Sequence, residues 1–263
     1  MNKRVNTSCF YILLIAAPAL CQAGPHAPAA GQPGSTAVGM NDPRLVAWAT
    51  GWQDYSVGTG CIETWQTPAK ALGNASGAIE DIVCLGNGGR ITLSFDQPII
   101  DGSDWDFAVF ENGITDDFLE LAYVEVSSNG IDFFRFPNDS LTADPVDGFG
   151  SIDPTNIDGF GGKYRREYGT PFDLGQLSDV SPLLDVNNVR FVRIVDIIGD
   201  GSYFDTSGDA IYDPHPTAGS GGFDLEAVGV MRVIPEPGGF VLCVSAAASL
   251  LICSRRRNRR GRN

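Results

Sequence analysis

The C-terminal segment, residues 233–263, constrains this chain most, because three physically different pieces follow one another there. Pro235, Glu236 and Pro237 break any helix or central strand. A charge-free apolar run then extends from Phe240 to Cys253. The end carries six arginines and no acid: Arg255, Arg256, Arg257, Arg259, Arg260 and Arg262.

The apolar run is shorter than the ~20 residues of a typical spanning helix. The arginines nevertheless favour a membrane segment whose basic end stays in the cytoplasm, with the preceding chain outside. The alternative is a basic tail after a last core element.

The order Pro235-Glu236-Pro237, short apolar helix and terminal arginine cluster resembles the PEP-CTERM sorting signal of bacterial surface and exported proteins. The resemblance covers residues 233–263. It implies recognition by an exosortase, a membrane-embedded transpeptidase-like enzyme that processes the tail. The implied partners are therefore the exosortase, the export machinery and the inner membrane.

The N-terminus has the three parts of a secretory signal. Lys3 and Arg4 are basic, residues 10–20 are apolar, and Cys21-Gln22-Ala23 offers small residues at the cleavage positions. We therefore predict a signal peptide over residues 1–23, with cleavage after Ala23. Two alternatives are lipidation at Cys21 and an uncleaved N-terminal anchor.

The charge distribution agrees with export. All 32 acidic residues lie between the two basic ends, so the exported part is strongly acidic. Such a surface repels nucleic acid and anionic lipid, which excludes nucleic acid as a partner. It suits a calcium-rich setting outside the cell, or only solubility.

Cys61 and Cys84 are the two cysteines left between the N-terminal and C-terminal segments. In an oxidising compartment the simplest expectation is one disulfide between them. A zinc site is disfavoured, because neither His26 nor His215 has the spacing that zinc requires.

Residues 24–41 are rich in Gly, Pro, Ala and Ser, and we predict a flexible linker there. Residues 42–232 form one body, in which short alternating runs predict half-buried strands. The predicted strands are residues 90–95, 105–110, 122–127, 132–136, 189–195 and 223–230. Asn129-Gly130 predicts a hairpin. Residues 43–55 are expected to form a short helix or an irregular cover, and residues 138–188 a long excursion of loops.

Short strands separated by Gly, Asp and Pro loops predict an all-β fold, a single antiparallel β-sandwich or jelly-roll domain. This domain would lie between the signal peptide and the C-terminal transmembrane sorting helix. The runs around Gly89–Asp96, Asp106–Gly113, Val124–Gly130 and Phe223–Val228 resemble a recurrent β-sandwich module of bacterial cell-surface proteins. That resemblance implies a fold and a location, but no defined activity.

Acidic residues suggest a calcium site, because glycine-rich loops with closely spaced carboxylates can wrap a hard cation. The candidate ligands are Glu111, Asn112, Asp196, Asp200, Asp205, Asp209 and Asp224, with Asp213 in the same stretch. The spacing does not match an EF-hand. The alternative is a set of solvated acidic loops with Asx turns.

No nucleophile elbow, nucleotide-binding loop or zinc-protease motif occurs in the sequence. The predicted function is therefore that of an exported, non-enzymatic protein of the cell envelope or extracellular matrix, sorted by an exosortase-type system. The alternative is a calcium-stabilised carbohydrate-binding module at the cell surface, with envelope polysaccharide as its ligand. Aromatic residues that could stack on sugars are Trp48, Trp52, Trp65, Trp105, Tyr203 and Tyr212.

Overall fold

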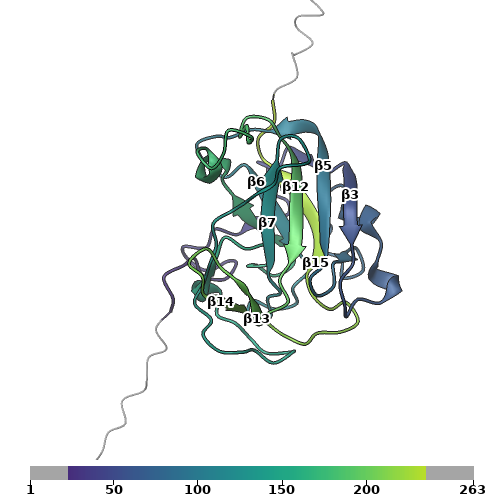
Figure 1. Ribbon diagram of the computed structural model, residues 1–263, viewed down its shortest axis with the longest axis vertical. Helices are drawn as coiled ribbons and strands as arrows, with labels where there is room; N and C mark the ends of the chain where they lie inside the picture. Colours follow the sequence, from purple (N-terminus) through teal and green to yellow (C-terminus); the bar gives the residue numbers. More distant parts are fainter. Residues whose placement is uncertain (1–22, 235–263) are drawn as a thin grey trace, which may run out of the picture.

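The computed structural model describes residues 23–234, which form an all-β fold built around two main antiparallel sheets (Figure 1). The predicted signal peptide lies outside the described residues except for Ala23, and the Pro235-Glu236-Pro237 motif, the apolar run and the arginines lie outside them entirely. Within residues 23–234, no helix has the length and apolar character needed to cross a membrane.

The first sheet has six strands in the order β1, β11, β6, β15, β2, with β4 pairing on β15. Their bounds are Val38–Gly39 for β1, Tyr168–Phe172 for β11, Phe107–Glu111 for β6, Asp224–Val230 for β15, Ala47–Trp48 for β2 and Val83–Cys84 for β4. Strand β6 is buried along its whole length, because β11 and β15 flank it on both sides.

The second sheet has five strands in the order β3, β5, β12, β7, β8. Their bounds are Gly51–Ser56 for β3, Arg90–Ile99 for β5, Val189–Asp196 for β12, Ala122–Ser127 for β7 and Phe134–Arg135 for β8. In Figure 1, β3, β5, β12 and β7 lie side by side, with β6 and β15 drawn beside and behind them.

Short elements complete the described chain. Two small two-stranded sheets pair β9 with β10 and β13 with β14. The bounds are Asp139–Ser140 for β9, Ile157–Asp158 for β10, Asp200–Phe204 for β13 and Ala210–Tyr212 for β14. The helical turns are all 3-10: η1 Glu63–Trp65, η2 Pro68–Ala71, η3 Pro154–Asn156 and η4 Leu174–Leu177.

One apolar core joins the two main sheets, which explains why the alternating runs of the sequence became strands. Along β12, Val192 and Ile194 are buried while Arg190 is exposed and Arg193 is half-buried. Val192 and Ile194 share a core cluster with residues of the first sheet such as Phe107 and Val228. The predicted strands at 90–95, 122–127 and 189–195 are therefore confirmed.

The predicted hairpin at Asn129-Gly130 is also confirmed. Strand β7 pairs antiparallel with β8, with Glu125 opposite Arg135. Gly130 has a φ of +75°, a conformation that glycine adopts without steric cost. The Ser127 hydroxyl accepts a hydrogen bond from the Gly130 amide, which fixes the turn.

Strand β11 lies in the segment that the sequence predicted to be loops, so that prediction is wrong at residues 168–172. Gly169 and Pro171 are uncommon in strands, so the sequence pattern of residues 168–172 does not indicate one. Proline fits there because β1 pairs only with Tyr168 and Gly169, which leaves Pro171 where β11 is an edge strand.

The segment 43–55 contains no helix. Instead, β2 pairs with the end of β15 and β3 pairs with β5, so the backbone hydrogen bonds of this segment go to the two sheets.

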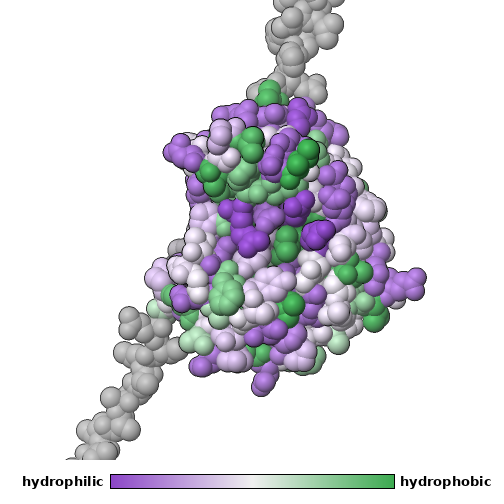
Figure 2. Space-filling view, viewed as in Figure 1, coloured by the Kyte–Doolittle hydropathy of each residue, from purple (hydrophilic) through white to green (hydrophobic). Residues whose placement is uncertain are grey.

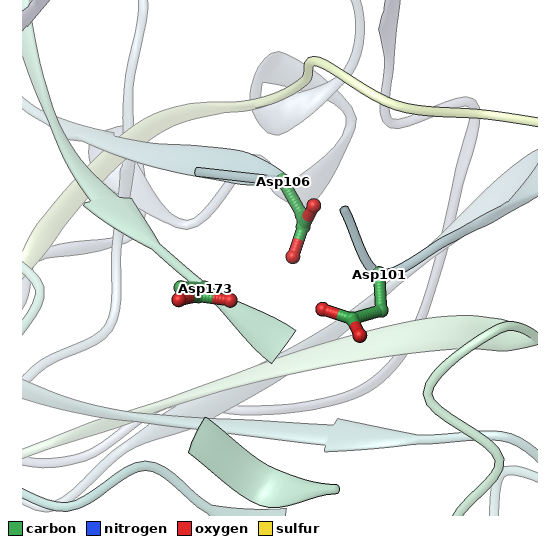
Figure 3. Close-up of side chains that lie close together, drawn as sticks. All are labelled: Asp101, Asp106 and Asp173. Carbon is green, nitrogen blue, oxygen red and sulfur yellow. The ribbon is translucent and has the colours of Figure 1, made fainter. Parts of the chain in front are cut away.

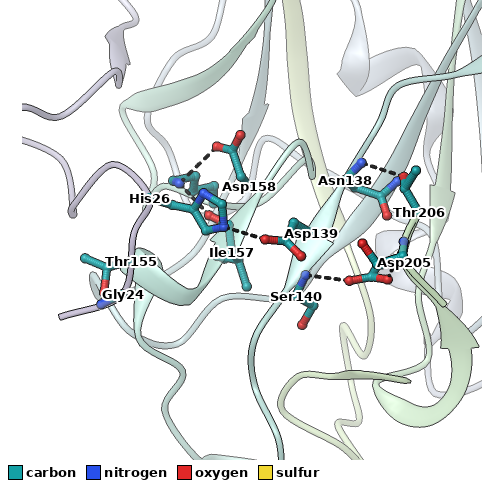
Figure 4. Close-up of polar contacts among 12 residues, drawn as sticks. Gly24, His26, Asn138, Asp139, Ser140, Thr155, Ile157, Asp158, Asp205 and Thr206 are labelled. Atoms are coloured by element: carbon teal, nitrogen blue, oxygen red, sulfur yellow. Dashed lines mark hydrogen bonds and ion pairs between the residues drawn. The ribbon is translucent and has the colours of Figure 1, made fainter. Parts of the chain in front are cut away.

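Residues 24–41 differ from the predicted flexible linker, because they are held to the body near both ends of the segment. The His26 side chain lies 2.7 Å from the Asp139 carboxylate, and Gly24 donates its amide proton to Thr155 (Figure 4). Thr36 hydrogen-bonds the Tyr164 hydroxyl, and β1 joins the first sheet. The body therefore begins well before residue 42.

The outer face of the second sheet is polar. Figure 2 shows hydrophilic side chains gathered in the middle of this face, with hydrophobic ones scattered around them. Glu125 lies 2.9 Å from Arg135 and 3.8 Å from Arg193, and the Arg193 guanidinium covers the ring of Phe133. Opposite charges across neighbouring strands thus keep this face solvated.

Replacing Phe107 with alanine should destabilise the protein by about 3–5 kcal/mol. Phe107 is fully buried, and its ring stacks on Phe172 at 5.3 Å. Chemical denaturation checks this expectation. Phe149→Ala is the matched control, because Phe149 is 90% exposed and its loss should change stability by about 0.5 kcal/mol or less. Equal effects of the two substitutions would contradict the assigned core.

Candidate acidic pocket

A cavity of about 440 Å³ opens where β6 ends and β15 begins, and we call it the acidic pocket. Its lining comes from the turn after β6, the approach to β7 and the loop before β15. The lining residues are Glu111, Asn112, Gly113, Ile114, Thr115, Asp117, Phe118, Glu120, Phe149, Ser151, Thr217, Ala218, Ser220 and Asp224.

Three buried or nearly buried carboxylates reach the acidic pocket from three segments. Glu111 is the last residue of β6 and accepts a hydrogen bond from the Gly113 amide at 2.6 Å. Glu120 precedes β7 and accepts hydrogen bonds from the Thr217 hydroxyl at 2.7 Å and the Gly222 amide at 3.1 Å. Asp224 opens β15. Asp224 lies at the turn after β6, because its carbonyl accepts a hydrogen bond from the Asn112 amide.

Two further buried carboxylates lie behind this lining. Asp196 ends β12 and accepts hydrogen bonds from the amides of Gly88 and Phe223. Asp213 accepts one from the Leu121 amide. Gly222 has a φ of +77°, and a Cβ there would lie 2.6 Å from Asp196 Oδ1. The loop before β15 therefore requires glycine so that its backbone can wrap the Asp196 carboxylate.

The electrostatics of this group are unfavourable for ionised carboxylates. Burial raises the pKa of Glu120 to about 8, and the charges of Asp224 and Asp196 add to the shift. Burial also raises the pKa of Asp196 and of Asp224 to about 7. For Glu111, burial and then the charges of Glu120 and Asp224 hold the pKa well above its ordinary value.

The same causes hold the pKa of Asp213 well above its ordinary value: burial first, then the charge of Asp196 and that of Glu120. These five carboxylates therefore repel one another across a common buried space.

The described residues that line the acidic pocket include no lysine, arginine or histidine. The nearby Arg165 lies 3.0 Å from Asp116, and its guanidinium covers the ring of Tyr168. Its charge is therefore directed to the surface. Buried carboxylates without a basic partner either stay protonated or take a cation.

Two buried oxygens of the acidic pocket lack hydrogen-bond partners. Asn112 is 9% exposed, and its Oδ1 accepts no hydrogen bond although its amide nitrogen donates to the Ile79 carbonyl. Asp224 Oδ1 is likewise without a partner. Amide and carboxylate oxygens are the ligands that calcium prefers, so both oxygens are suited to a hard cation.

The rim of the acidic pocket is apolar. Ile114 is 70% exposed and Phe149 is 90% exposed. The Phe149 ring stacks on that of Phe118 with centroids 6.3 Å apart. An exposed aromatic ring above a polar floor can contact an extended ligand.

The structure brings together only some of the predicted calcium ligands. Glu111, Asn112 and Asp224 line the acidic pocket, and Asp196 lies behind them. Asp200 and Asp209 are exposed and belong to the β13–β14 region.

Asp205 is engaged elsewhere, so Asp200, Asp205 and Asp209 do not join the acidic pocket, and their role as calcium ligands stays a prediction. One carboxylate oxygen of Asp205 accepts the Ser140 amide proton, and the other accepts those of Ser207 and Asp209 (Figure 4). The bonds from Ser207 and Asp209 fix a local turn, as an Asx turn does, whereas the bond from Ser140 ties β9 to this turn.

Sequence reasoning missed Glu120 altogether and did not place Asp213 among the ligands. Glu120 stands between Leu119 and Leu121, both fully buried. The sequence does contain an indication of this burial: a single acid between two large apolar residues just before a strand. When the two apolar neighbours are buried, the acid between them is buried as well.

The two body cysteines are neighbours and are free thiols in the structure. Cys61 Sγ lies 3.8 Å from the Cys84 carbonyl oxygen, and the Cys84 thiol donates to the Gly221 carbonyl. Burial raises the pKa of both thiols. The disulfide stays a prediction.

The aromatic residues proposed from the sequence for sugar stacking do not line the acidic pocket. Trp48 packs on Phe110, Tyr203 packs on Tyr123, and Trp52 contacts Tyr55 edge-on. The aromatic residues at the pocket are instead Phe118 and Phe149.

Comparisons with known proteins do not assign the chain to a family. No family model matches it, and no curated protein matches it in sequence.

In chelator, the protein should lose stability as the pH rises from about 4 to about 8. The folded-state pKa values of Asp196, Asp224 and Glu120 lie above their ordinary values, at about 7, 7 and 8. Their contribution to stability is therefore complete below the ordinary values and is lost as these groups ionise in the folded state. Melting temperatures measured across this range check the prediction.

Glu120→Gln should flatten this pH dependence, because glutamine keeps an acceptor for Thr217 and Gly222 but cannot ionise. The control Asp209→Asn changes an exposed acid outside the acidic pocket and should follow the wild type. Parallel curves for wild type and Glu120→Gln would mean that Glu120 does not contribute.

Proposed function

We propose that this protein is an exported, non-enzymatic surface protein of the cell envelope or extracellular matrix whose acidic pocket binds calcium. Five carboxylates that are buried or nearly buried, with no basic residue in the described pocket lining, carry the calcium part of the proposal. A divalent cation would remove their mutual repulsion. Glu111, Glu120, Asp224 and the Asn112 amide oxygen would be its ligands.

We propose further that the two main sheets form a β-sandwich or jelly roll, closed at one end by the calcium site. The shared core cluster and the antiparallel pairing of the named strands support this architecture. The resemblance of residues 233–263 to the PEP-CTERM signal supports export, sorting by an exosortase, and contact with the inner membrane.

A second candidate is calcium-dependent binding of envelope polysaccharide at the same place. The exposed ring of Phe149 on the rim, stacked on the half-buried ring of Phe118, favours it. Bound calcium can coordinate sugar hydroxyls through positions that the protein leaves open, while an aromatic ring packs against the sugar face. Retention of the wild type, but not of Phe149→Ala, on a polysaccharide column in calcium would favour this candidate. Cleavage of the polysaccharide would contradict the non-enzymatic assignment.

Calcium should raise the melting temperature of the full-length protein in mild detergent by about 3–6 °C at a concentration tenfold above its dissociation constant, equivalent to about 1.4 kcal/mol. Magnesium should raise it less, because magnesium dehydrates reluctantly and demands regular octahedral geometry. Differential scanning calorimetry at fixed ionic strength checks both expectations.

Asp224→Asn should reduce this rise, because it removes a carboxylate with an unpartnered oxygen. Asp209→Asn is the matched control: it makes the same chemical change at another acid that the sequence predicted as a ligand, and it should keep the full rise. Equal rises in all three proteins would rule out the acidic pocket as the calcium site.

Export is tested by intact-mass analysis of the protein from its native host. We expect a mature chain that begins at Gly24, with a tail processed near Pro235, Glu236 and Pro237. Alkylation before reduction should add no mass at Cys61 or Cys84 if the disulfide forms. A chain that retains residues 1–23 would contradict cleavage of the signal, and two alkylated thiols would contradict the disulfide.

A further inference from the structure

A second group of carboxylates lies at the opposite end of β6. Asp106 immediately precedes β6, whereas Glu111 ends it, so the two groups are separated by about 17 Å along the strand. The group consists of Asp101, Asp106 and Asp173, and one oxygen of each lies within 4.8 Å of the others. Sequence reasoning did not select any of these three residues.

The fold brings the three carboxylates together from both sheets. Asp101 follows β5 of the second sheet, and its amide bonds the Val186 carbonyl. Asp106 and Asp173 are neighbours across β6 and β11, because Phe107 pairs with Phe172 and the Asp106 amide donates to Phe172. Figure 3 shows the three side chains directed toward a common space.

Oxygens in this space are buried and lack hydrogen bonds. Asp106 is completely buried, and its Oδ1 has no hydrogen-bond partner, while its Oδ2 accepts the Leu174 amide proton. Asp101 Oδ1 is also buried without a partner. Two separate segments thus present carboxylate oxygens without hydrogen bonds to the same place.

The backbone of Gly175 approaches the group closely. Gly175 donates its amide proton to Asp173 Oδ1. A Cβ at position 175 would lie 2.9 Å from Asp173 Oδ1 and 3.3 Å from Asp101 Oδ1. A side chain at this position would therefore intrude between the two carboxylates.

The charges nearby are incompletely balanced. Arg232 lies beside the group, with its Nε 3.4 Å from Asp106 Oδ1 but without hydrogen-bond geometry. Three carboxylates and one guanidinium leave two negative charges, which a divalent cation would neutralise. Calcium–oxygen distances of about 2.3–2.6 Å allow one calcium ion to bridge oxygens with this spacing.

We propose that Asp101, Asp106 and Asp173 form a second, structural calcium site, with water completing the coordination. It would fasten the end of β5 to β6 and β11, and hence one main sheet to the other. The site lies where the body ends: the Arg232 carbonyl accepts the Ile100 amide proton, and Val233 bridges to Ile99. Calcium bound here would therefore hold Arg232 and Val233 in place at the end of β5.

Equilibrium dialysis of the full-length protein in mild detergent with radioactive calcium tests this proposal. Asp101→Asn should weaken the binding of one calcium ion by about tenfold or more, because it removes a charged ligand. Asp173→Asn should weaken the same ion, and asparagine can still accept the Gly175 amide proton, so the helical turn keeps its cap. In chelator neither variant should melt below the wild type, since each relieves repulsion.

Asp104→Asn is the matched control, because Asp104 is an exposed acid in the same connection between β5 and β6 and lies outside the group. It should bind calcium as the wild type does. Unchanged binding in Asp101→Asn and Asp173→Asn would overturn the proposal, and so would an equal loss in Asp104→Asn. Glu120→Gln distinguishes the two sites, because it changes only the acidic pocket. This variant should still bind the calcium ion at Asp101, Asp106 and Asp173, whether or not the acidic pocket binds another.

Discussion

Burial of carboxylates at both ends of β6 is the constraint on which the rest of the structure depends. Between Asp106 and Glu111, β6 is buried and apolar, and its Phe107 packs in the core that joins the two main sheets. Backbone amides of the surrounding loops point at the carboxylates: Gly113 at Glu111, Gly222 at Glu120 and Phe223 at Asp196. These loops are thus shaped by hydrogen bonds to buried carboxylates, and such carboxylates either stay protonated or take a cation.

The strands were predictable where burial alternates along the chain, as in β5, β7 and β12. Strand β11 was not, because its glycine and proline remove the usual strand signal and it forms only between β1 and β6. Residues 24–41 have the composition of a linker, yet pairing of β1 with β11 and the contacts of His26 hold them to the body. Such long-range pairing outweighs local composition and is not visible in it.

The acidic pocket was predictable in part, for a physical reason. An acid at the end of a strand beside a glycine turn, such as Glu111, lies at the end of a sheet, where several chain segments meet and can form a pocket. The dense acids of residues 200–209 lie at the surface, or fix turns as Asp205 does. A high density of acids along the chain does not predict that they are buried, whereas large apolar neighbours do. Glu120 and Asp106 have such neighbours and are buried, although both lie outside that acidic stretch.

The most direct test of the central claim is a crystal structure of the protein grown with calcium, with anomalous diffraction used to locate the ions. The account predicts an anomalous peak within coordination distance of Glu111, Glu120 and Asp224, with the Asn112 amide oxygen as a further ligand. Well-ordered carboxylates in the acidic pocket with no peak between them, at calcium well above its dissociation constant, would contradict it. The buried acids would then be neutralised by protons, and the pocket would have to serve another ligand.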